Sequence, residues 1–339
     1  MRLRLCLWLA FAALAIAGCS SGSLNSRATS PNPSSSPAPG PSPGPSPAPS
    51  PSPPGPGPTP SPTPTPSDPS ADHVVLVVLE NHSFSDVIGN PVMPYLNSLA
   101  AQYSLAGNYF AVVHPSIGNY FMLTTGVVES TDDAFAGIVT DDNIVRALTA
   151  SSLTWRAYME SIPAPGYTGP DVPPYLRHHD PFSYFSDVLS SASEAANIVP
   201  FTQLATDLAS GALPRFAFIA PNVEHDAHNC PGNALTCPDA AKLAAADAWL
   251  RSNIDPLLNS PAFARGVLII TFDESVTTDL AHGGGQVAAV LAGPLVKKGF
   301  RSTTFYQHPS TLRLILDLLH ASDHPGASAT ATAMNEFFP

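Results

Sequence analysis

The stretch that decides the fold is His73-Val74-Val75-Leu76-Val77-Val78-Leu79, and it is followed directly by Glu80-Asn81-His82. An unbroken apolar run of this length, rich in β-branched residues, is typical of a central parallel strand that is covered on both faces. In open α/β sheets, functional side chains gather beyond the carboxyl ends of such strands. The polar residues at 80–82 therefore mark a candidate site as well as the end of a strand.

Outward from this run, strand-like and helix-like segments alternate along the chain. Further strands are expected at about 107–113, 154–159, 215–220, 266–272 and 287–292. Helices are expected at about 93–103, from Ser116 onward, and at about 141–150, 239–255 and 308–321. This alternation predicts an α/β fold, a three-layer α/β/α sandwich with a mostly parallel central sheet.

The segment before this alternating region has a different composition. Of the 39 prolines in the 339-residue chain, 19 fall between residues 31 and 69. Proline has no backbone N–H and fixes φ, so this segment cannot form a helix or a sheet. We expect residues 20–70 to be a Pro/Ser-rich disordered linker and residues 71–339 to form one domain. A ligand for proline-recognition modules is the alternative interpretation of the linker.

The N-terminus has the features of an export signal, because Arg2 and Arg4 precede an apolar run that ends in small residues. Ile16-Ala17-Gly18-Cys19 resembles the lipobox of bacterial lipoproteins, in which the cysteine is lipidated. We therefore expect residues 1–19 to be a lipoprotein signal peptide, and the exported chain to be tethered to the bacterial envelope, periplasmic or at the cell surface, through Cys19. An ordinary cleaved signal is the alternative.

Charge and cysteine usage restrict the partners. The chain has 26 acidic against 14 basic residues, a formal net charge of −12. Such a surface repels phosphate backbones, so no nucleic-acid partner is expected. Cys230 and Cys237 lie close together in the sequence, and in an oxidising compartment we expect them to form a disulfide. A zinc site that also uses His225 and His228 is the alternative.

Two acidic groups directly follow two of the predicted strands. Glu80 and Asn81 follow the strand at 73–79, and Asp273 and Glu274 follow the strand at 266–272. Carboxylates gathered at one sheet edge repel one another unless a cation compensates them. Oxygen ligands suit Mg²⁺, Ca²⁺ or Mn²⁺, and Zn²⁺ or Fe becomes possible if histidine joins. Taken alone, each pair could also be a helix N-cap and first-turn acid.

Ser116 follows a predicted strand and a proline, and it begins a predicted helix. A hydroxyl at a helix N-terminus lies where an anion is favoured. Beside a divalent ion, such a serine can act as a nucleophile, whereas a plain N-cap is the alternative. Several histidines also fall at predicted strand ends, where they can bind phosphate, protonate a leaving alkoxide or ligate a metal.

A series of motifs in a fixed order spans residues 71–325. These motifs are Val78-Leu79-Glu80-Asn81-His82-Ser83-Phe84, His114-Pro115-Ser116 with Asn119-Tyr120, His179-Asp180-Pro181-Phe182, Pro221-Asn222 with His225-Asp226 and His228, Thr271-Phe272-Asp273-Glu274, and Gln307-His308-Pro309-Ser310. The series resembles the bacterial phosphoesterase family that contains phospholipases C and acid phosphatases, built on an alkaline-phosphatase-like fold. The most similar members are secreted acid phosphatases that act on phosphatidylinositol 3-phosphate.

The resemblance implies roles for nine residues. The implied metal ligands are Glu80, Asn81, Asp273 and Glu274, and the implied catalytic residues are the nucleophile Ser116 with His179, His225, Asp226 and His228. The implied activity is that of a metal-dependent phosphomonoesterase, which acts on a phosphate ester or phospholipid through a phosphoserine. A phospholipase C-type phosphodiesterase and a non-enzymatic tethered binding lipoprotein are the alternatives. The glycine run after His282 departs from the His-Val-Pro of many phospholipases C, and His179-Asp180 departs from the commoner His-Asn.

Overall fold

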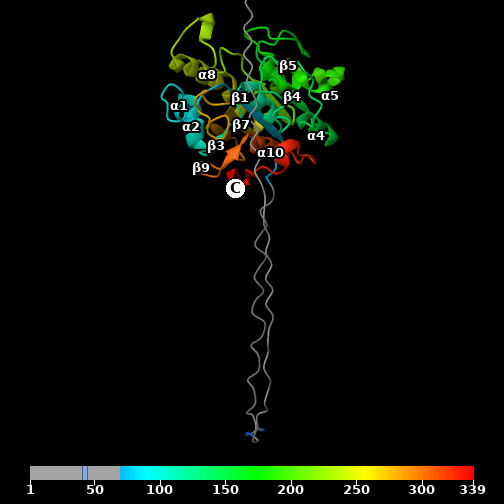
Figure 1. Cartoon of the computed structure of the whole chain (residues 1–339), viewed down its shortest axis with the longest axis vertical. Helices are drawn as coiled ribbons and strands as arrows, with labels where there is room; N and C mark the ends of the chain where they lie inside the picture. The colour runs from blue at the N-terminus through cyan, green and yellow to red at the C-terminus, as the bar shows by residue number, and fades with distance from the viewer. Residues whose placement is uncertain (1–39, 41–43, 45–68) are drawn as a thin grey trace, which may run out of the picture. The chain divides into compact units, whose positions relative to one another are not determined.

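The computed structural model describes residues 69–339 together with Gly40 and Gly44. The predicted signal peptide, the predicted lipid site at Cys19 and nearly all of the predicted linker lie outside the described residues. Within the part of the chain that is described, no helix has the length and apolar character needed to cross a membrane. Figure 1 shows the arrangement of the elements in residues 69–339.

The centre of the fold is an eight-stranded sheet in the order β5-β4-β6-β1-β7-β8-β2-β9. Strand β1 lies between β6 and β7 and is parallel to both. The five strands from β5 to β7 are all parallel, whereas β8 runs antiparallel to β7. The strands are β1 (His73–Leu79), β2 (Ser104–Ala106), β3 (Tyr109–Phe110), β4 (Trp155–Met159), β5 (Ile198–Pro200), β6 (Phe216–Ala220), β7 (Gly266–Phe272), β8 (Ala289–Ala292), β9 (Phe300–Ser302) and β10 (Tyr306–Gln307).

Burial on both faces explains why the central strands are continuously apolar. Residues 74–79 of β1 and all of β7 are buried, as expected for parallel strands covered by helices. The bounds of β1 and β7 agree with the strands predicted at 73–79 and 266–272, and β4 and β6 begin one residue later than predicted. The mostly parallel sheet is confirmed.

The strand predicted at about 107–113 is present only as the two residues of β3, and it does not belong to the main sheet. Instead, β2 joins the main sheet, and β3 pairs with β10 in a separate two-stranded sheet. Gly107 lies between β2 and β3, where an added Cβ would be 2.8 Å from the Ser302 carbonyl oxygen. The chain therefore leaves the main sheet at a close approach that only glycine permits. The strand predicted at 287–292 begins at Ala289 and is antiparallel to its neighbour β7.

Helices cover both faces of the sheet and complete the three layers. Helix α2 packs on α8, β2 and β8, whereas α10 packs on α3, α4 and β1, and Figure 1 shows α2 and α8 on the other side of the sheet from α4 and α10. The α-helices are α1 (Phe84–Val87), α2 (Pro94–Gln102), α3 (Ser116–Met122), α4 (Ile144–Ala150), α5 (Ser186–Leu189), α6 (Ala192–Ala195), α7 (Gln203–Ser210), α8 (Asp239–Asn253), α9 (Asp255–Leu258) and α10 (His308–Leu319). The predicted helix at 239–255 divides into α8 and α9, with Pro256 in the first turn of α9.

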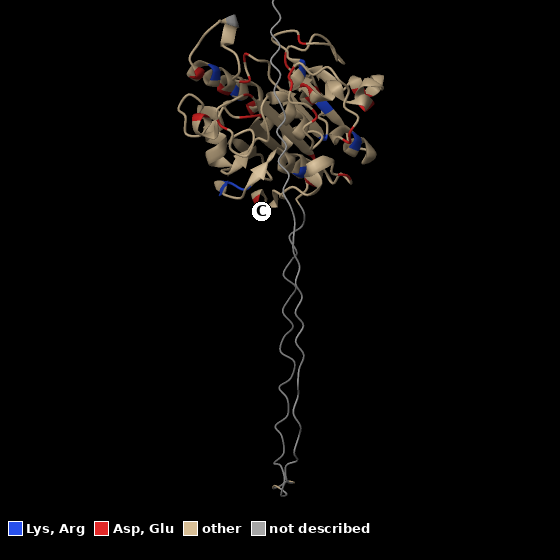
Figure 2. Cartoon of the chain, in the orientation of Figure 1, with Lys and Arg blue, Asp and Glu red and all other residues tan. Residues whose placement is uncertain are grey.

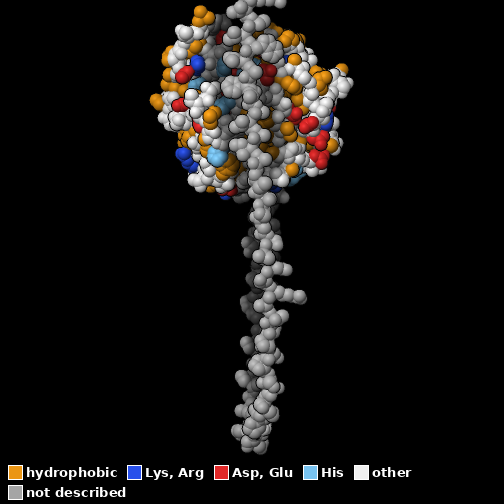
Figure 3. Space-filling model, in the orientation of Figure 1, with side chains coloured by type: hydrophobic (Ala, Val, Ile, Leu, Met, Phe, Trp, Pro, Cys, Tyr) orange, Lys and Arg blue, Asp and Glu red, His pale blue; other side chains and the backbone are white. Residues whose placement is uncertain are grey.

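The distribution of basic residues and the pairing of two cysteines agree with the sequence analysis. Within the described residues, the Lys and Arg positions are scattered along the ribbon in Figure 2, and their side chains form no continuous basic patch on the face shown in Figure 3. The predicted disulfide between Cys230 and Cys237 is present, with a Cα–Cα distance of 5.7 Å.

A buried carboxylate joins α2 to α8. The two oxygens of Asp247, in α8, accept hydrogen bonds from the backbone N–H groups of Tyr95 (2.9 Å) and Leu96 (2.8 Å), which lie in the first turn of α2. The residue before α2, Met93, has no side chain that could cap the helix. Asp247 therefore supplies from another helix the acceptor that an N-cap residue would ordinarily supply.

Replacing this carboxylate should destabilise the domain. We expect Asp247→Ala to lower the free energy of unfolding by about 1–3 kcal/mol, because two N–H groups of α2 lose their acceptor. Urea unfolding followed by circular dichroism measures the change. Asp323→Ala, which removes an exposed carboxylate, is the control and should change the stability by less than about 0.5 kcal/mol. Equal stability of the two variants would contradict the capping role.

Candidate active site

The carboxyl ends of β1 and β7 bring the two predicted acidic groups together. The Asn81 backbone N–H donates to Asp273 Oδ1 (3.1 Å), and the Asn81 side-chain amide donates to Glu274 Oε1 (2.7 Å). Asn81 has a φ of 45°, a left-handed conformation that asparagine adopts more readily than most residues. The turn after β1 is thus fixed to the turn after β7.

Two hydroxyl groups of helix α3 donate hydrogen bonds to the Glu80 carboxylate. Ser116 Oγ donates to Glu80 Oε2 at 3.0 Å, and the Tyr120 hydroxyl donates to Glu80 Oε1. Residues four apart lie on the same face of a helix, so one helix directs both groups at one carboxylate. Glu80 is fully buried and Ser116 is almost so.

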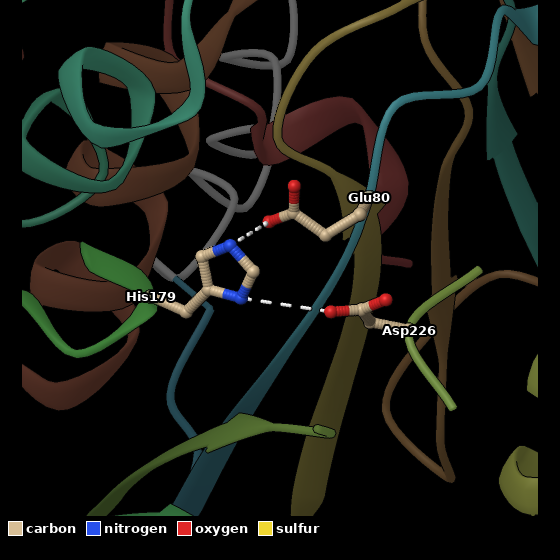
Figure 4. A group of neighbouring side chains, drawn as sticks. All are labelled: Glu80, His179 and Asp226. Atoms are coloured by element: carbon tan, nitrogen blue, oxygen red, sulfur yellow. Dashed lines mark ion pairs between the residues drawn. The ribbon is translucent and has the colours of Figure 1, made fainter. Parts of the chain in front are cut away.

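A second set of contacts meets at the same glutamate. His179 Nε2 lies 3.3 Å from Glu80 Oε1, and His179 Nδ1 lies 3.5 Å from Asp226 Oδ2. Figure 4 shows the imidazole between the two carboxylates, with one ring nitrogen directed at each. All three side chains are buried, and their ligand atoms lie within 4.8 Å of one another, as in a group that could hold a metal ion.

These acids lie in an environment that opposes their charge. Burial, followed by the neighbouring Asp273 and Asp226, raises the pKa of Glu80 well above its usual range. Burial is also the main cause of the raised pKa of Asp226 and Asp273, and it raises the pKa of Glu274 to about 8. Burial lowers the pKa of His179 well below its ordinary value, so His179 supplies no compensating positive charge at neutral pH.

The donor set fits a divalent cation. Three buried oxygens, Asn81 Oδ1, Asp226 Oδ2 and Asp273 Oδ2, have no hydrogen-bond partner among the described residues. Buried polar atoms are ordinarily satisfied, and an ion is the natural partner for oxygens surrounded by carboxylates. Oxygen ligands with one available imidazole nitrogen suit Mg²⁺, Ca²⁺ and Mn²⁺, and also Zn²⁺ or Fe.

The side chains of Asn119 and His114 hold the segment that leads to Ser116. Asn119 Oδ1 accepts hydrogen bonds from the backbone of Val112 (3.0 Å) and Val113 (3.2 Å). His114 Nδ1 lies 3.0 Å from Glu274 Oε2. Glu274 is therefore engaged by His114 and Asn81, which distinguishes it from Asp273 with its unpartnered oxygen.

A buried histidine of α10 contacts the backbone of the turn that follows β7. His308 Nε2 lies 2.6 Å from the Asp273 carbonyl oxygen, and Nδ1 lies 3.0 Å from the Tyr109 hydroxyl. Burial lowers the pKa of His308 to about 4, so the ring is neutral at pH 7 and carries one N–H. With Nε2 as the donor, Nδ1 accepts from Tyr109, and both ring nitrogens are satisfied.

A cleft of about 580 Å³ opens above these residues. It is lined by Asn81, His82, Pro115, Ser116, Asp133, Ala227, His228, Asn229, Asp239, Lys242, Glu274, Val276 and Thr277. His228 is exposed at its margin, and its backbone N–H donates to Asp226 Oδ1 (2.8 Å). The cleft gives a substrate access to Ser116 and to the acidic cluster.

Two histidines that the sequence analysis named, His225 and His282, do not line the cleft. His225 Nδ1 lies 3.0 Å from Glu160 Oε1. His282 packs against Phe110 and Phe305. The following Gly283 has a φ of 105°, and an added Cβ would lie 1.9 Å from the Val112 carbonyl oxygen. The glycine run thus allows this loop to approach the segment before Ser116.

The sequence analysis assigned no role to Tyr120, Asp133 or Lys242. Tyr120 could have been found, because it follows Ser116 by one helical turn. Asp133 accepts from the Ile117 backbone N–H (3.1 Å), and Lys242 enters the cleft from α8. Neither follows a predicted strand, so the strand-end argument could not reach them.

Comparison with known proteins shows the family of the chain. Residues 90–320 match the model described as the Phosphoesterase family. The chain belongs to the Phosphoesterase family. It is accordingly a hydrolase of phosphoric ester bonds, as the motif series implied. The matched range begins after Glu80 and Asn81.

Two relatives illustrate the membership. Phosphatidylinositol-3-phosphatase of Mycobacterium tuberculosis (strain ATCC 25618 / H37Rv) is 31% identical over 256 residues, which cover 74% of this chain and 78% of that protein. Acid phosphatase of Aspergillus fumigatus (strain ATCC MYA-4609 / CBS 101355 / FGSC A1100 / Af293) is 32% identical over 249 residues, which cover 70% of this chain and 52% of that protein. The chain thus spans about half of the fungal relative.

Solved structures confirm the type of fold. A protein in the alkaline phosphatase superfamily from Vibrio parahaemolyticus has a TM-score of 0.57 at 11% identity, covering 79% of this chain and 72% of that one. Lipoteichoic acid synthase LtaP from Listeria monocytogenes has a TM-score of 0.52 at 13% identity, covering 76% and 74%. The Phosphoesterase-family chain therefore has an alkaline-phosphatase-like α/β fold.

Removing a carboxylate charge from the cluster should weaken metal binding. We expect Asp273→Asn and Asp226→Asn each to lower the affinity for a divalent metal at least about 10-fold, because each keeps its shape but loses a charged oxygen. Metal analysis after dialysis, followed by titration with Mg²⁺, Ca²⁺, Mn²⁺ and Zn²⁺, measures the effect.

The control is Asp187→Asn, which alters a partly buried carboxylate that lies 3.3 Å from Arg146. It should bind metal like the unaltered chain. Unchanged affinity in both cluster variants would exclude a metal site formed by these carboxylates. Loss of metal affinity in the Asp226 variant alone would restrict the metal to the group around His179.

Proposed function

We propose that this chain is a metal-dependent phosphomonoesterase of the acid-phosphatase type, with Ser116 as its nucleophile. The observation that carries the proposal is the hydrogen bond of the Ser116 hydroxyl to the buried Glu80 carboxylate, at the base of a cleft that reaches solvent. A serine in this position is accessible to substrate on one side and is held by an acid on the other. That is the arrangement required for transfer of a phosphoryl group to a hydroxyl.

A divalent cation held by Glu80, Asn81, Asp226 and Asp273, with His179 or Glu274 adjoining, would neutralise part of the carboxylate charge and stabilise negative charge on the phosphoryl oxygens. Ser116 Oγ attacks phosphorus as its hydroxyl proton passes to the Glu80 carboxylate that accepts its hydrogen bond, and the bond from phosphorus to the leaving oxygen breaks as the bond from Oγ forms. The departing alcohol takes a proton. Water then cleaves the phosphoserine, which releases inorganic phosphate and restores the Ser116 hydroxyl.

The geometry favours His228 as the proton donor. His179 lies buried between two carboxylates, and His225 is paired with Glu160 outside the cleft. His228 is exposed at the cleft. Its Nδ1 lies 2.8 Å from Asn229 Oδ1, and the hydrogen bonds within residues 69–339 leave Nε2 available.

We further propose that the substrate is phosphatidylinositol 3-phosphate or a related phospholipid monoester. This rests on the relative named phosphatidylinositol-3-phosphatase, of which the chain covers 78%. Export as a lipoprotein, with lipidated Cys19 and the Pro/Ser-rich segment as a tether, would place the domain near lipid surfaces. The disulfide between Cys230 and Cys237 is consistent with an oxidising compartment.

Removing the nucleophile should abolish turnover. For the full chain with p-nitrophenyl phosphate, we expect Ser116→Ala to lower kcat at least about 10³-fold, and a chelator to abolish activity reversibly. Acid quenching followed by mass spectrometry should show a phosphate on the peptide that contains Ser116. Ser210→Ala, at the exposed end of α7, should retain full activity.

The same assay separates the alternatives. Hydrolysis of p-nitrophenylphosphorylcholine without hydrolysis of p-nitrophenyl phosphate would replace the proposal with a phospholipase C-type diesterase. A chain that binds these compounds but hydrolyses neither would be a binding lipoprotein. Full activity in Ser116→Ala would exclude this serine as the nucleophile.

The proton donor can be identified through the leaving group. We expect His228→Gln to lower kcat/KM about 10²-fold for an alkyl phosphate, whose alkoxide must be protonated as it leaves. The loss for p-nitrophenyl phosphate should be less than about 10-fold, because p-nitrophenolate leaves without a proton. His225→Gln is the matched control and should affect both substrates equally and weakly. A larger leaving-group effect in the His225 variant would reverse the assignment.

A further inference from the structure

The cleft that contains Ser116 continues into a second hollow of about 380 Å³. His228, Asn229 and Lys242 line both hollows, so these three residues form the junction between them. The far side of the second hollow is lined by Ala234 and Leu235 of the loop that the disulfide closes. A substrate with its phosphoryl group at Ser116 has room to extend past this junction.

Positive charge at the junction comes from one residue. Lys242 is the only Lys or Arg among the residues that line either hollow. Its Nζ lies 3.1 Å from Asp239 Oδ1, and the Asp239 side chain is 73% exposed. Water therefore screens this ion pair strongly. The lysine ammonium has three donors, and two remain for a ligand.

The surrounding acids determine where a second negative charge can bind. Glu80, Asp226 and Asp273 are fully buried beneath the Ser116 cleft, and they repel any anion beyond the one phosphoryl group that a metal would compensate. Glu224 lines the second hollow, where its Oε2 accepts a hydrogen bond from the Gly232 backbone N–H at 3.2 Å. Asp239, which pairs with Lys242, also lines the Ser116 cleft. Among the described residues that line the two hollows, Lys242 is still the one Lys or Arg side chain that can bind an anion.

We propose that Lys242, with His228 and Asn229, forms a subsite for a second anionic group that the leaving alcohol carries. The substrate class is then a phosphomonoester whose alcohol part bears a further phosphate, as a phosphodiester or a monoester. This inference rests on the proposed function, because it assumes that the phosphoryl group binds at Ser116. A phosphoinositide, with its phosphodiester across the inositol ring, belongs to this class.

The test uses a soluble pair of ligands that differ in the second phosphate. Glycerophosphoinositol 3-phosphate carries the phosphodiester, and inositol 3-phosphate lacks it. Binding to the full chain with Ser116→Ala is measured by calorimetry, and KM is measured with the unaltered serine. We expect the phosphodiester ligand to bind about 5-fold more tightly, as a partly exposed charge pair allows. Lys242→Gln should remove this advantage, and Lys242→Arg should retain it.

The control is Lys298→Gln, which alters an exposed lysine outside both hollows and should leave the ratio of affinities unchanged. An equal loss of affinity for both ligands in Lys242→Gln would overturn the proposed subsite, because the lysine would then hold the transferred phosphoryl group. Equal affinity of the two ligands for unaltered Lys242 would overturn it as well. Lys242-dependent discrimination in a chain that hydrolyses neither ligand would support the subsite while rejecting the proposed phosphatase.

Discussion

Burial of several carboxylates at one edge of a parallel sheet is the constraint on which the rest of this structure depends. Glu80, Asp226 and Asp273 are fully buried, and Glu274 is nearly so. Their mutual repulsion would favour opening of this edge, and Glu80, Asp273 and Glu274 each accept a hydrogen bond from another element, whereas Asp226 accepts one from the His228 backbone N–H of its own turn. The hydroxyl groups of Ser116 and Tyr120 hold Glu80, and the Asn81 amide groups hold the acids that follow β7. Charge that the protein leaves uncompensated is available to bind a cation.

The parallel arrangement makes this concentration of charge possible. Because β1 is parallel to both β6 and β7, three strands end at the same edge and deliver polar residues there without a long loop. The apolar strands occupy the buried interior, and the acids of the cluster begin at the first residue beyond β1 and β7, whereas Asp226 lies farther along the turn after β6. The same topology accounts for the cleft, since the loops that follow these strands form its walls.

The parts of the fold that depend on local patterns could be predicted from the sequence. Strands β1 and β7 are long and apolar enough to be located to the residue, whereas β9 and β10, with three and two residues, are too short to carry a pattern. The segment around Gly107 misled the prediction, because its apolar residues belong to two different sheets and the division depends on a backbone approach to Ser302. Tertiary context decides such a case.

The candidate site could be predicted to the same degree and for the same reason. Residues directly after strands, such as Glu80 and Asp273, lie together because topology brings strand ends together. His225 and His228 are three residues apart, yet one pairs with Glu160 and the other faces the cleft, because the turn between them decides their directions. Lys242 enters from a helix of the outer layer, and no strand-end pattern includes it.

The contact between His308 and the Asp273 carbonyl oxygen has a consequence for the order in which the protein matures. Asp273 and Glu274 leave the ribosome before α10, so their turn lacks its buried support while the chain is still being made. Ser116 and the turns after β1 and β7 are thus all synthesised before the helix that carries His308. The turn that follows β7 therefore gains its buried contact with His308 only when α10 docks against it.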